Sequence, residues 1–68
     1  MKTNHNPELN FILGNCYKAI GYFSDAIHEY DKAIKVEPKG CYYNNRGNCH
    51  LCLQDIMRAE HDYKRAIK

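Results

Sequence analysis

The sequence lacks the features that would place the protein in a membrane or on a nucleic acid. It has no apolar run near the length of a membrane span, and its start, MKTNHNPELN, lacks the apolar stretch of a signal peptide. Ten basic and eight acidic residues leave a formal charge of +2, too small to favour nucleic acid or a membrane surface as a partner. We therefore expect a cytoplasmic protein with neither of these partners.

The sequence also lacks the residue groupings on which enzymes rely. It contains no glycine-rich phosphate loop, no Ser/His/Asp grouping and no paired carboxylates. His28 and His61 both lie among charged neighbours, so we expect them to be solvated rather than to bind a ligand. We predict no enzymatic activity, no cofactor and no bound metal.

Glycine and proline are scarce, at four and two among 68 residues, and no segment is low in complexity. Disorder is therefore expected only in a short flexible lead over residues 1–6. A chain of this length forms at most one small domain. A single core of that size is only marginally stable unless a crosslink or a partner subunit supports it.

What the sequence does contain is an internal repeat. Residues 25–35 read DAIHEYDKAIK and residues 58–68 read RAEHDYKRAIK. Identities at one separation of 33 residues include Gly14/Gly47, Asn15/Asn48, Cys16/Cys49, Ala26/Ala59, His28/His61, Tyr30/Tyr63, Ala33/Ala66 and Ile34/Ile67. Eight pairs in one register indicate that a single structural unit occurs twice.

Each unit is predicted to form two helices, because its apolar residues recur at helical spacing and never alternate as in a strand. The first helix should begin at Asn6, Pro7 and Glu8, which offer an N-cap, a proline in the first turn and an acid near the positive end of the helix dipole. Gly21 and residues 36–40 mark the ends of the first two helices. The expected apolar stripes are Leu9, Ile12, Leu13, Cys16, Tyr17 and Ile20; Phe23, Ala26, Ile27, Tyr30, Ala33 and Ile34; Tyr43, Gly47, His50, Leu51 and Leu53; and Ile56, Ala59, Tyr63, Ala66 and Ile67.

The four cysteines are expected to be reduced, because no secreted context supports a disulfide framework. Cys49 and Cys52 form a Cys-x-x-Cys spacing, but the second such pair that a structural zinc site needs is missing. Cys16 and Cys49 hold equivalent places in the repeat, so core packing of small thiols is the preferred interpretation. A thiol–metal site is the minor alternative.

The repeat resembles the tetratricopeptide repeat, a helix–turn–helix unit of about 34 residues with small and aromatic residues at fixed places. The residues in register with that pattern are Asn10, Leu13, Gly14, Tyr17, Ala26, Tyr30, Ala33 and Pro38 in the first copy, and Tyr43, Gly47, Ala59, Tyr63 and Ala66 in the second. Asn10 stands where the pattern usually has a large aromatic residue. Arg46 and His50 stand where that pattern usually has leucine and tyrosine. The resemblance implies an all-α fold, in which repeats over residues 7–39 and 40–68 stack as an antiparallel four-helix right-handed solenoid fragment without a C-terminal capping helix.

The resemblance also implies a function, since stacked tetratricopeptide repeats bind extended peptides in a concave groove lined by the first helix of each pair. We therefore expect a protein–protein interaction module with a protein or peptide ligand. The groove residues would be Phe11, Asn15, Lys18, Asn44, Asn45, Asn48 and Leu51. An asparagine amide both donates and accepts, so it can hold a peptide backbone or a carboxylate. The alternative is that these asparagines are surface residues without a ligand.

Co-chaperones of this family grip acidic chaperone tails with a clamp of lysine, arginine and asparagine drawn from three repeats. Asn15 and Asn45 match the two asparagines of that clamp. Phe11 occupies the place of the first lysine, and the chain has no third repeat. The clamp is incomplete, so the resemblance does not extend to binding of chaperone tails.

A second function class is a structural unit that associates with itself. In a longer array the last helix is covered by the next repeat or by a cap. Here Ile56, Ala59, Tyr63 and Ile67 are expected to lack such cover. A homodimer closed through this helix would bury them.

Overall fold

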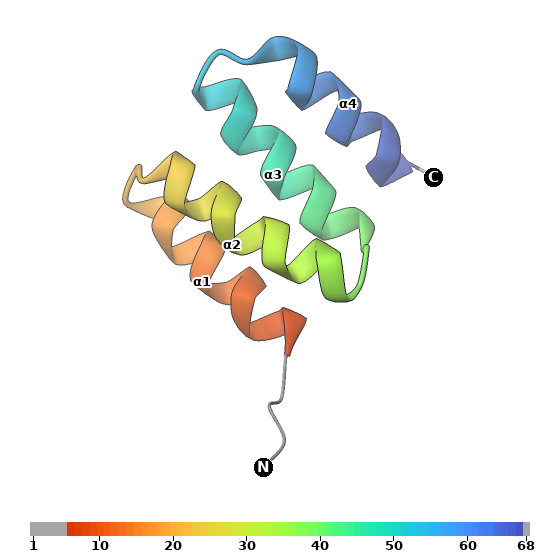
Figure 1. Cartoon of the computed structure of the whole chain (residues 1–68). Helices are drawn as coiled ribbons and strands as arrows, with labels where there is room; N and C mark the ends of the chain where they lie inside the picture. The colour runs from red at the N-terminus through yellow and green to blue at the C-terminus, as the bar shows by residue number, and fades with distance from the viewer. Residues whose placement is uncertain (1–5, 68) are drawn as a thin grey trace.

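The computed structural model describes residues 6–67, which form four α-helices joined by short turns (Figure 1). The helices are α1 (Pro7–Ala19), α2 (Phe23–Val36), α3 (Gly40–Cys52) and α4 (Ile56–Ile67). No strand occurs within these described residues, and the predicted all-α class is confirmed. Residues 1–5 and 68 lie outside the described part, and with them all of the predicted flexible lead except Asn6.

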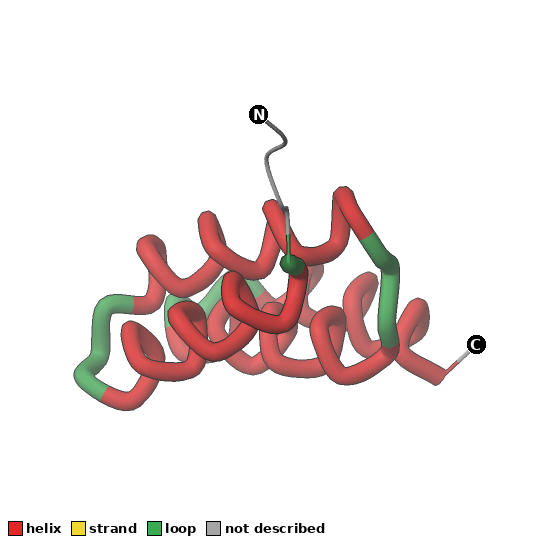
Figure 2. Tube along the Cα trace, turned by 90° about the horizontal axis from the view of Figure 1, so that it is seen from below, coloured by secondary structure: helices red, strands yellow, loops and turns green. Residues whose placement is uncertain are grey.

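The four described helices form two antiparallel pairs set side by side. α1 packs on α2 and α3 packs on α4, while α2 also packs on α3 and joins the two pairs. α1 and α4 therefore lie at opposite edges of the row (Figure 1). The turn between α2 and α3 lies at one end of the helices and the other two turns lie at the opposite end. The view turned by 90° also places these connections at the helix ends (Figure 2).

The first helix begins as its sequence predicts. The side-chain Oδ1 of Asn6 accepts a hydrogen bond from the backbone N–H of Glu8 at 3.0 Å, and Pro7 occupies the first turn. Asn6 thus belongs to the start of α1 rather than to the lead. The turn after α1 uses Gly21 in the left-handed region, at a φ of 87°, which only glycine adopts without steric cost.

One packing device occurs in both repeats. A Cβ atom placed on Gly14 would lie 2.5 Å from the ring of Tyr30, and one placed on Gly47 would lie 2.9 Å from the ring of Tyr63. The glycine on the first helix of each pair therefore lets a tyrosine of the second helix lie directly against the backbone. The predicted close approach at both glycines is confirmed.

The core lies where α2 meets both its neighbours. Ala26 and Tyr30 of α2 are fully buried together with Cys49 of α3, and Phe11 and Phe23 pack against this group. The apolar stripe predicted for α2 therefore forms the centre of the molecule. This follows from the position of α2, which packs on α1 of its own repeat and on α3 of the other.

Most of the stripe predicted for α1 is not buried. Leu9, Ile12, Leu13, Cys16 and Ile20 are all exposed, and only Tyr17 of that stripe packs against the core. α1 instead buries Gly14 and turns Phe11 and Tyr17 towards the core. The physical reason is position: α1 lies at the edge of the row, so only the side that faces α2 and α3 is covered by described residues.

Candidate functional site

Asparagines from both repeats meet on one side of α1 and α3. The Nδ2 group of Asn45 donates a hydrogen bond to Oδ1 of Asn15 at 2.8 Å. The same oxygen accepts a hydrogen bond from the hydroxyl of Tyr30, and Asn48 accepts one from the hydroxyl of Tyr63 in the same way. Burial raises the pKa of the Tyr30 hydroxyl to about 12, so this group remains a donor at neutral pH. The contacts fix the amide planes of two asparagines that belong to different repeats.

The predicted groove has three further residues on the same two helices, Lys18 on α1 and Asn44 and Leu51 on α3. Asn44 and Leu51 are exposed and Lys18 is half-buried. At 100° per residue, Asn44, Asn48 and Leu51 fall on one side of α3. These three residues add one amide, one basic and one aliphatic side chain to the asparagines of α1 and α3.

Phe11 has a different place from the one that its groove assignment predicts. Its ring centroid lies 4.9 Å from that of Tyr42 and 5.9 Å from that of Tyr30. Phe11 therefore connects α1 to both α2 and α3 and packs against the core. This correction has the same cause as the exposed stripe of α1: the neighbouring helices, not the apolar pattern, decide which side is covered.

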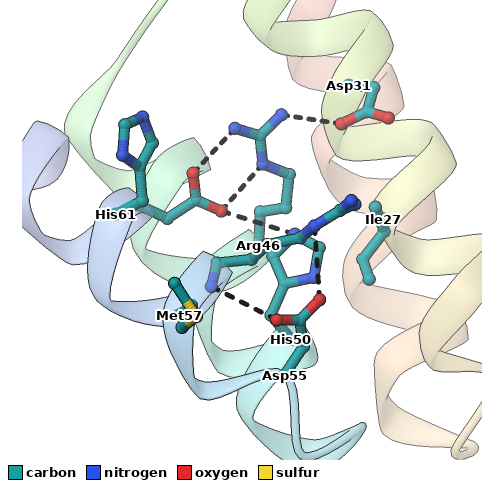
Figure 3. A pocket seen from close by; sticks show the side chains of 9 residues that line it. Ile27, Asp31, Arg46, His50, Asp55, Met57 and His61 are labelled. Atoms are coloured by element: carbon teal, nitrogen blue, oxygen red, sulfur yellow. Dashed lines mark hydrogen bonds and ion pairs between the residues drawn. The ribbon is translucent and has the colours of Figure 1, made fainter.

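A charged network joins three helices on the other side of α3 (Figure 3). The Nε and Nη2 groups of Arg46 donate to the two carboxylate oxygens of Asp62, at 2.9 and 2.7 Å. Its Nη1 group donates to Asp31 of α2 at 2.7 Å. Asp62 is only 2% exposed. The bonds to Asp62 raise the pKa of the Arg46 guanidinium, so Arg46 stays charged.

The residues of the network line a depression of about 740 Å³ between α2, α3 and α4 (Figure 3). His50 lies at its edge, with Nε2 3.7 Å from Asp62. Asp55 and Arg58 pair at 3.3 Å nearby. Arg46 neutralises Asp31 and Asp62, and Arg58 neutralises Asp55, while His50 and His61 also line the depression. Within residues 6–67, no group of three or more His, Cys, Asp or Glu side chains is placed to hold a metal ion.

The comparison with known proteins agrees with this architecture. Residues 7–39 match the model of the tetratricopeptide repeat family. Heat shock protein STI1 of Saccharomyces cerevisiae is 39% identical over an alignment of 56 residues, and the match covers 78% of this chain and 9% of that protein. The chain belongs to the tetratricopeptide repeat family. It spans less than a tenth of the length of the curated relative that it matches. No solved structure gives a significant match.

Two departures from the tetratricopeptide pattern, Arg46 and His50, are explained by the structure. Both belong to the charged network, where Arg46 replaces an apolar contact by ion pairs to α2 and α4. The sequence contained one signal for this: Asp62 occupies the same repeat position as Glu29, so an acid occurs there in both tetratricopeptide repeats. The burial of Asp62 could not be read from that pattern.

The cysteines of the two tetratricopeptide repeats differ in burial. All four are free, but Cys49 is fully buried, and its burial raises the pKa of the thiol to about 11. Cys16, Cys41 and Cys52 are exposed. The packing interpretation is right for Cys49 and wrong for Cys16, because no described helix covers the first repeat on that side.

The α4 residues assigned to self-association do not form one exposed surface. Ala59 is fully buried and Tyr63 is half-buried, because both face Gly47 of α3. Only Ile56 and Ile67 are exposed. The assignment of Ala59 and Tyr63 to an uncovered face is therefore wrong: they form the contact within the second tetratricopeptide repeat.

None of the helices within residues 6–67 combines the length and the apolar character that crossing a bilayer requires.

Proposed function

We propose that this chain is a non-catalytic protein-interaction module that binds an extended peptide across the asparagine surface of α1 and α3, defined by Asn15, Lys18, Asn44, Asn45, Asn48 and Leu51. Tetratricopeptide repeats are a protein-interaction fold, which supports the general role. The observation that carries the specific proposal is the hydrogen bond from Asn45 to Asn15, because it joins the two repeats into one polar surface.

The geometry suits recognition of a peptide main chain. The Oδ1 atoms of Asn15 and Asn48 are occupied by tyrosine hydroxyls, so these side chains offer their Nδ2 groups as oriented donors. A pre-oriented donor loses little conformational freedom on binding. Each such bond would contribute on the order of 1 kcal/mol, and more where the acceptor is a carboxylate.

The remaining groups indicate the class of peptide. Lys18 supplies a positive charge at the edge of the asparagine surface, which favours a peptide that ends in a free carboxylate or carries acidic side chains. Leu51 supplies an exposed aliphatic contact. Phe11, in the place of the lysine of the chaperone-tail clamp, is packed between tyrosines and contributes no charge.

The proposed setting is the reducing cytoplasm, and the proposed ligand is protein rather than nucleic acid or membrane. Four free thiols, three of them exposed, are compatible with a reducing compartment. The small net charge of +2 gives no electrostatic basis for either of the other partners.

Side-chain amide resonances test the proposal directly. We would titrate the isotope-labelled chain with a degenerate pool of decapeptides, once with free and once with amidated C-termini. The Asn44, Asn45 and Asn48 amide signals should shift, and more strongly with free C-termini. Shifts confined to α2 and α4, or none at millimolar peptide, would overturn the proposal.

Variants sharpen the same test. Asn44→Ala combined with Leu51→Ala removes two exposed groups of the asparagine surface without disturbing a tyrosine, and should weaken peptide binding severalfold. Met57→Ala, on the exposed side of α4, is the matched control and should bind as the wild type does. Asn15 and Asn48 are unsuitable here, because their replacement also leaves Tyr30 and Tyr63 without a hydrogen-bond partner.

A further inference from the structure

The edge helix α1 carries an apolar surface that no described residue covers. It consists of Leu9, Ile12, Leu13, Cys16 and Ile20, which we call the α1 stripe. The exposed fractions of its four aliphatic side chains run from 41% for Leu13 to 64% for Ile20. Contiguous apolar surface of this kind on a small protein is a common sign of an interface.

The internal repeat shows that this position on the helix is a contact position. The residues 33 places after Leu9, Ile12, Leu13 and Cys16 are Tyr42, Asn45, Arg46 and Cys49. In α3 these residues form the contact with the preceding repeat: Cys49 is buried against Ala26 and Tyr30 of α2, and Arg46 pairs with Asp31 of α2. The α1 stripe is thus the same surface without its covering helix.

The chemistry of the α1 stripe differs from that of its counterpart in α3. Leu13 replaces Arg46 and Ile12 replaces Asn45, so the α1 stripe contains no charged or amide side chain. An uncharged apolar strip along one helix is complementary to another copy of itself. Two such strips can pair about a two-fold axis and close the interface.

Head-to-tail stacking of copies is disfavoured by charge. In that arrangement α4 of one copy would cover α1 of the next, as α2 covers α3. The α4 residues equivalent to Ile27 and Asp31 of α2 are Glu60 and Lys64, both exposed. Placing them against the α1 stripe would remove two charges from water without offering either a partner there.

We propose that two copies of this chain pair through their α1 stripes, with the two α1 helices antiparallel about a two-fold axis. The Leu9 end of one stripe then lies against the Ile20 end of the other, and Cys16 lies near the axis. One helix face buries less than the roughly 800 Å² per partner of a standard interface, so the dimer is a weak one. It leaves the asparagine surface of each copy for a peptide.

Sedimentation equilibrium over micromolar to millimolar concentrations tests this pairing. The decisive variant is Leu13→Arg, which gives α1 the residue that α3 carries at the same place. The matched control is Met57→Arg on α4, where the wild-type side chain is 81% exposed. Wild type and control should dimerise alike, and Leu13→Arg should dissociate at least about tenfold more readily, the effect of roughly 1.4 kcal/mol. Ile12→Asn, again the α3 residue, provides a second variant if Leu13→Arg does not fold.

Three results would overturn the proposal: a wild-type monomer at millimolar concentration, a Leu13→Arg or Ile12→Asn chain that folds and dimerises as the wild type does, or oligomers that grow without limit. The last of these indicates head-to-tail stacking. Helicity of each variant, measured by circular dichroism at low concentration, separates loss of pairing from loss of fold.

Cysteine alkylation gives an independent readout in a single sample. Cys16 lies in the α1 stripe, whereas Cys52 is exposed on α3. The alkylation rate of Cys16 should fall as protein concentration rises through the dimer range, while that of Cys52 stays constant. A dimer in which Cys16 keeps its monomer rate would contradict pairing through α1.

Discussion

Leu13 and Arg46 hold the same place in the two repeats. Leu13 faces solvent, whereas Arg46 on α3 forms ion pairs with α2 and α4. Around them the repeats are built alike: a glycine accepts a tyrosine ring, and the next residue, asparagine, accepts the tyrosine hydroxyl. The difference shows that the shared unit specifies the packing within a repeat. The side chains at the contact between repeats instead follow from which neighbour is present.

The second helices differ in a parallel way. In the first repeat, Asn10 donates a hydrogen bond to Glu29 at 2.9 Å. In the second, the equivalent acid Asp62 is almost fully buried and holds Arg46 through two bonds. The same acidic position thus supports a neutral donor at the edge and a buried ion pair where three helices meet.

Removing the buried ion pair between Arg46 and Asp62 should give the largest difference in stability loss between the two repeats. Asp62→Ala leaves Arg46 without its main partner, so we expect a loss of about 3 kcal/mol in the free energy of unfolding, measured by urea denaturation. Glu29→Ala, at the equivalent place in the first repeat, should cost only about 1 kcal/mol.

A double replacement provides the control for that prediction. Arg46→Leu with Asp62→Leu removes both charges together and gives residue 46 the side chain found at Leu13. It should recover most of the loss seen for Asp62→Ala, because no charge remains buried without a partner. Equal losses for Asp62→Ala and Glu29→Ala would contradict this prediction, because they would show that the two acids contribute equally to the free energy of unfolding.

Substitutions at Gly14 and Gly47 should differ less in the stability that they cost. Gly14→Ala drives a methyl group into the ring of Tyr30, which is fully buried and cannot move, so we expect a loss of about 2 kcal/mol. Gly47→Ala meets Tyr63, which is half-buried on the edge helix α4 and can shift. Thermal unfolding should show the smaller loss for Gly47→Ala; the reverse order would contradict this account of the two contacts.

A substitution in the second turn should give the smallest change in stability, and it should stabilise the chain rather than destabilise it. Gly21 and Gln54 hold equivalent places and both adopt a left-handed backbone, with φ of 87° and 64°. A residue with a Cβ atom pays roughly 1–2 kcal/mol there, so Gln54→Gly should stabilise the chain by about 1 kcal/mol or slightly less. Gln54→Ala keeps the strain and serves as the control. A gain from alanine equal to that from glycine would locate the effect in the side chain instead.

The repeat period and the glycine–tyrosine positions were predictable from the sequence, because an identity that recurs at one spacing reports directly on a structural unit. The N-cap at Asn6 was predictable for a similar reason, since it depends on neighbours within one turn. The Arg46–Asp62 pair was not, because it joins residues of different helices and neither residue type signals burial by itself. The hydrogen bond between Asn15 and Asn45 could not be predicted for the same reason, because it joins residues of different repeats.

By itself, the sequence determined the four helices within residues 6–67, their order and the contact inside each repeat, because those depend on spacing along the chain. Only the tertiary structure decided which apolar residues are covered. Helical spacing places Leu9, Leu13 and Cys16 on a common side of α1, but it does not state whether another helix lies there. Cys49 is buried and Cys16 is exposed for that reason alone: α2 lies against α3, and no described helix lies on the outer side of α1.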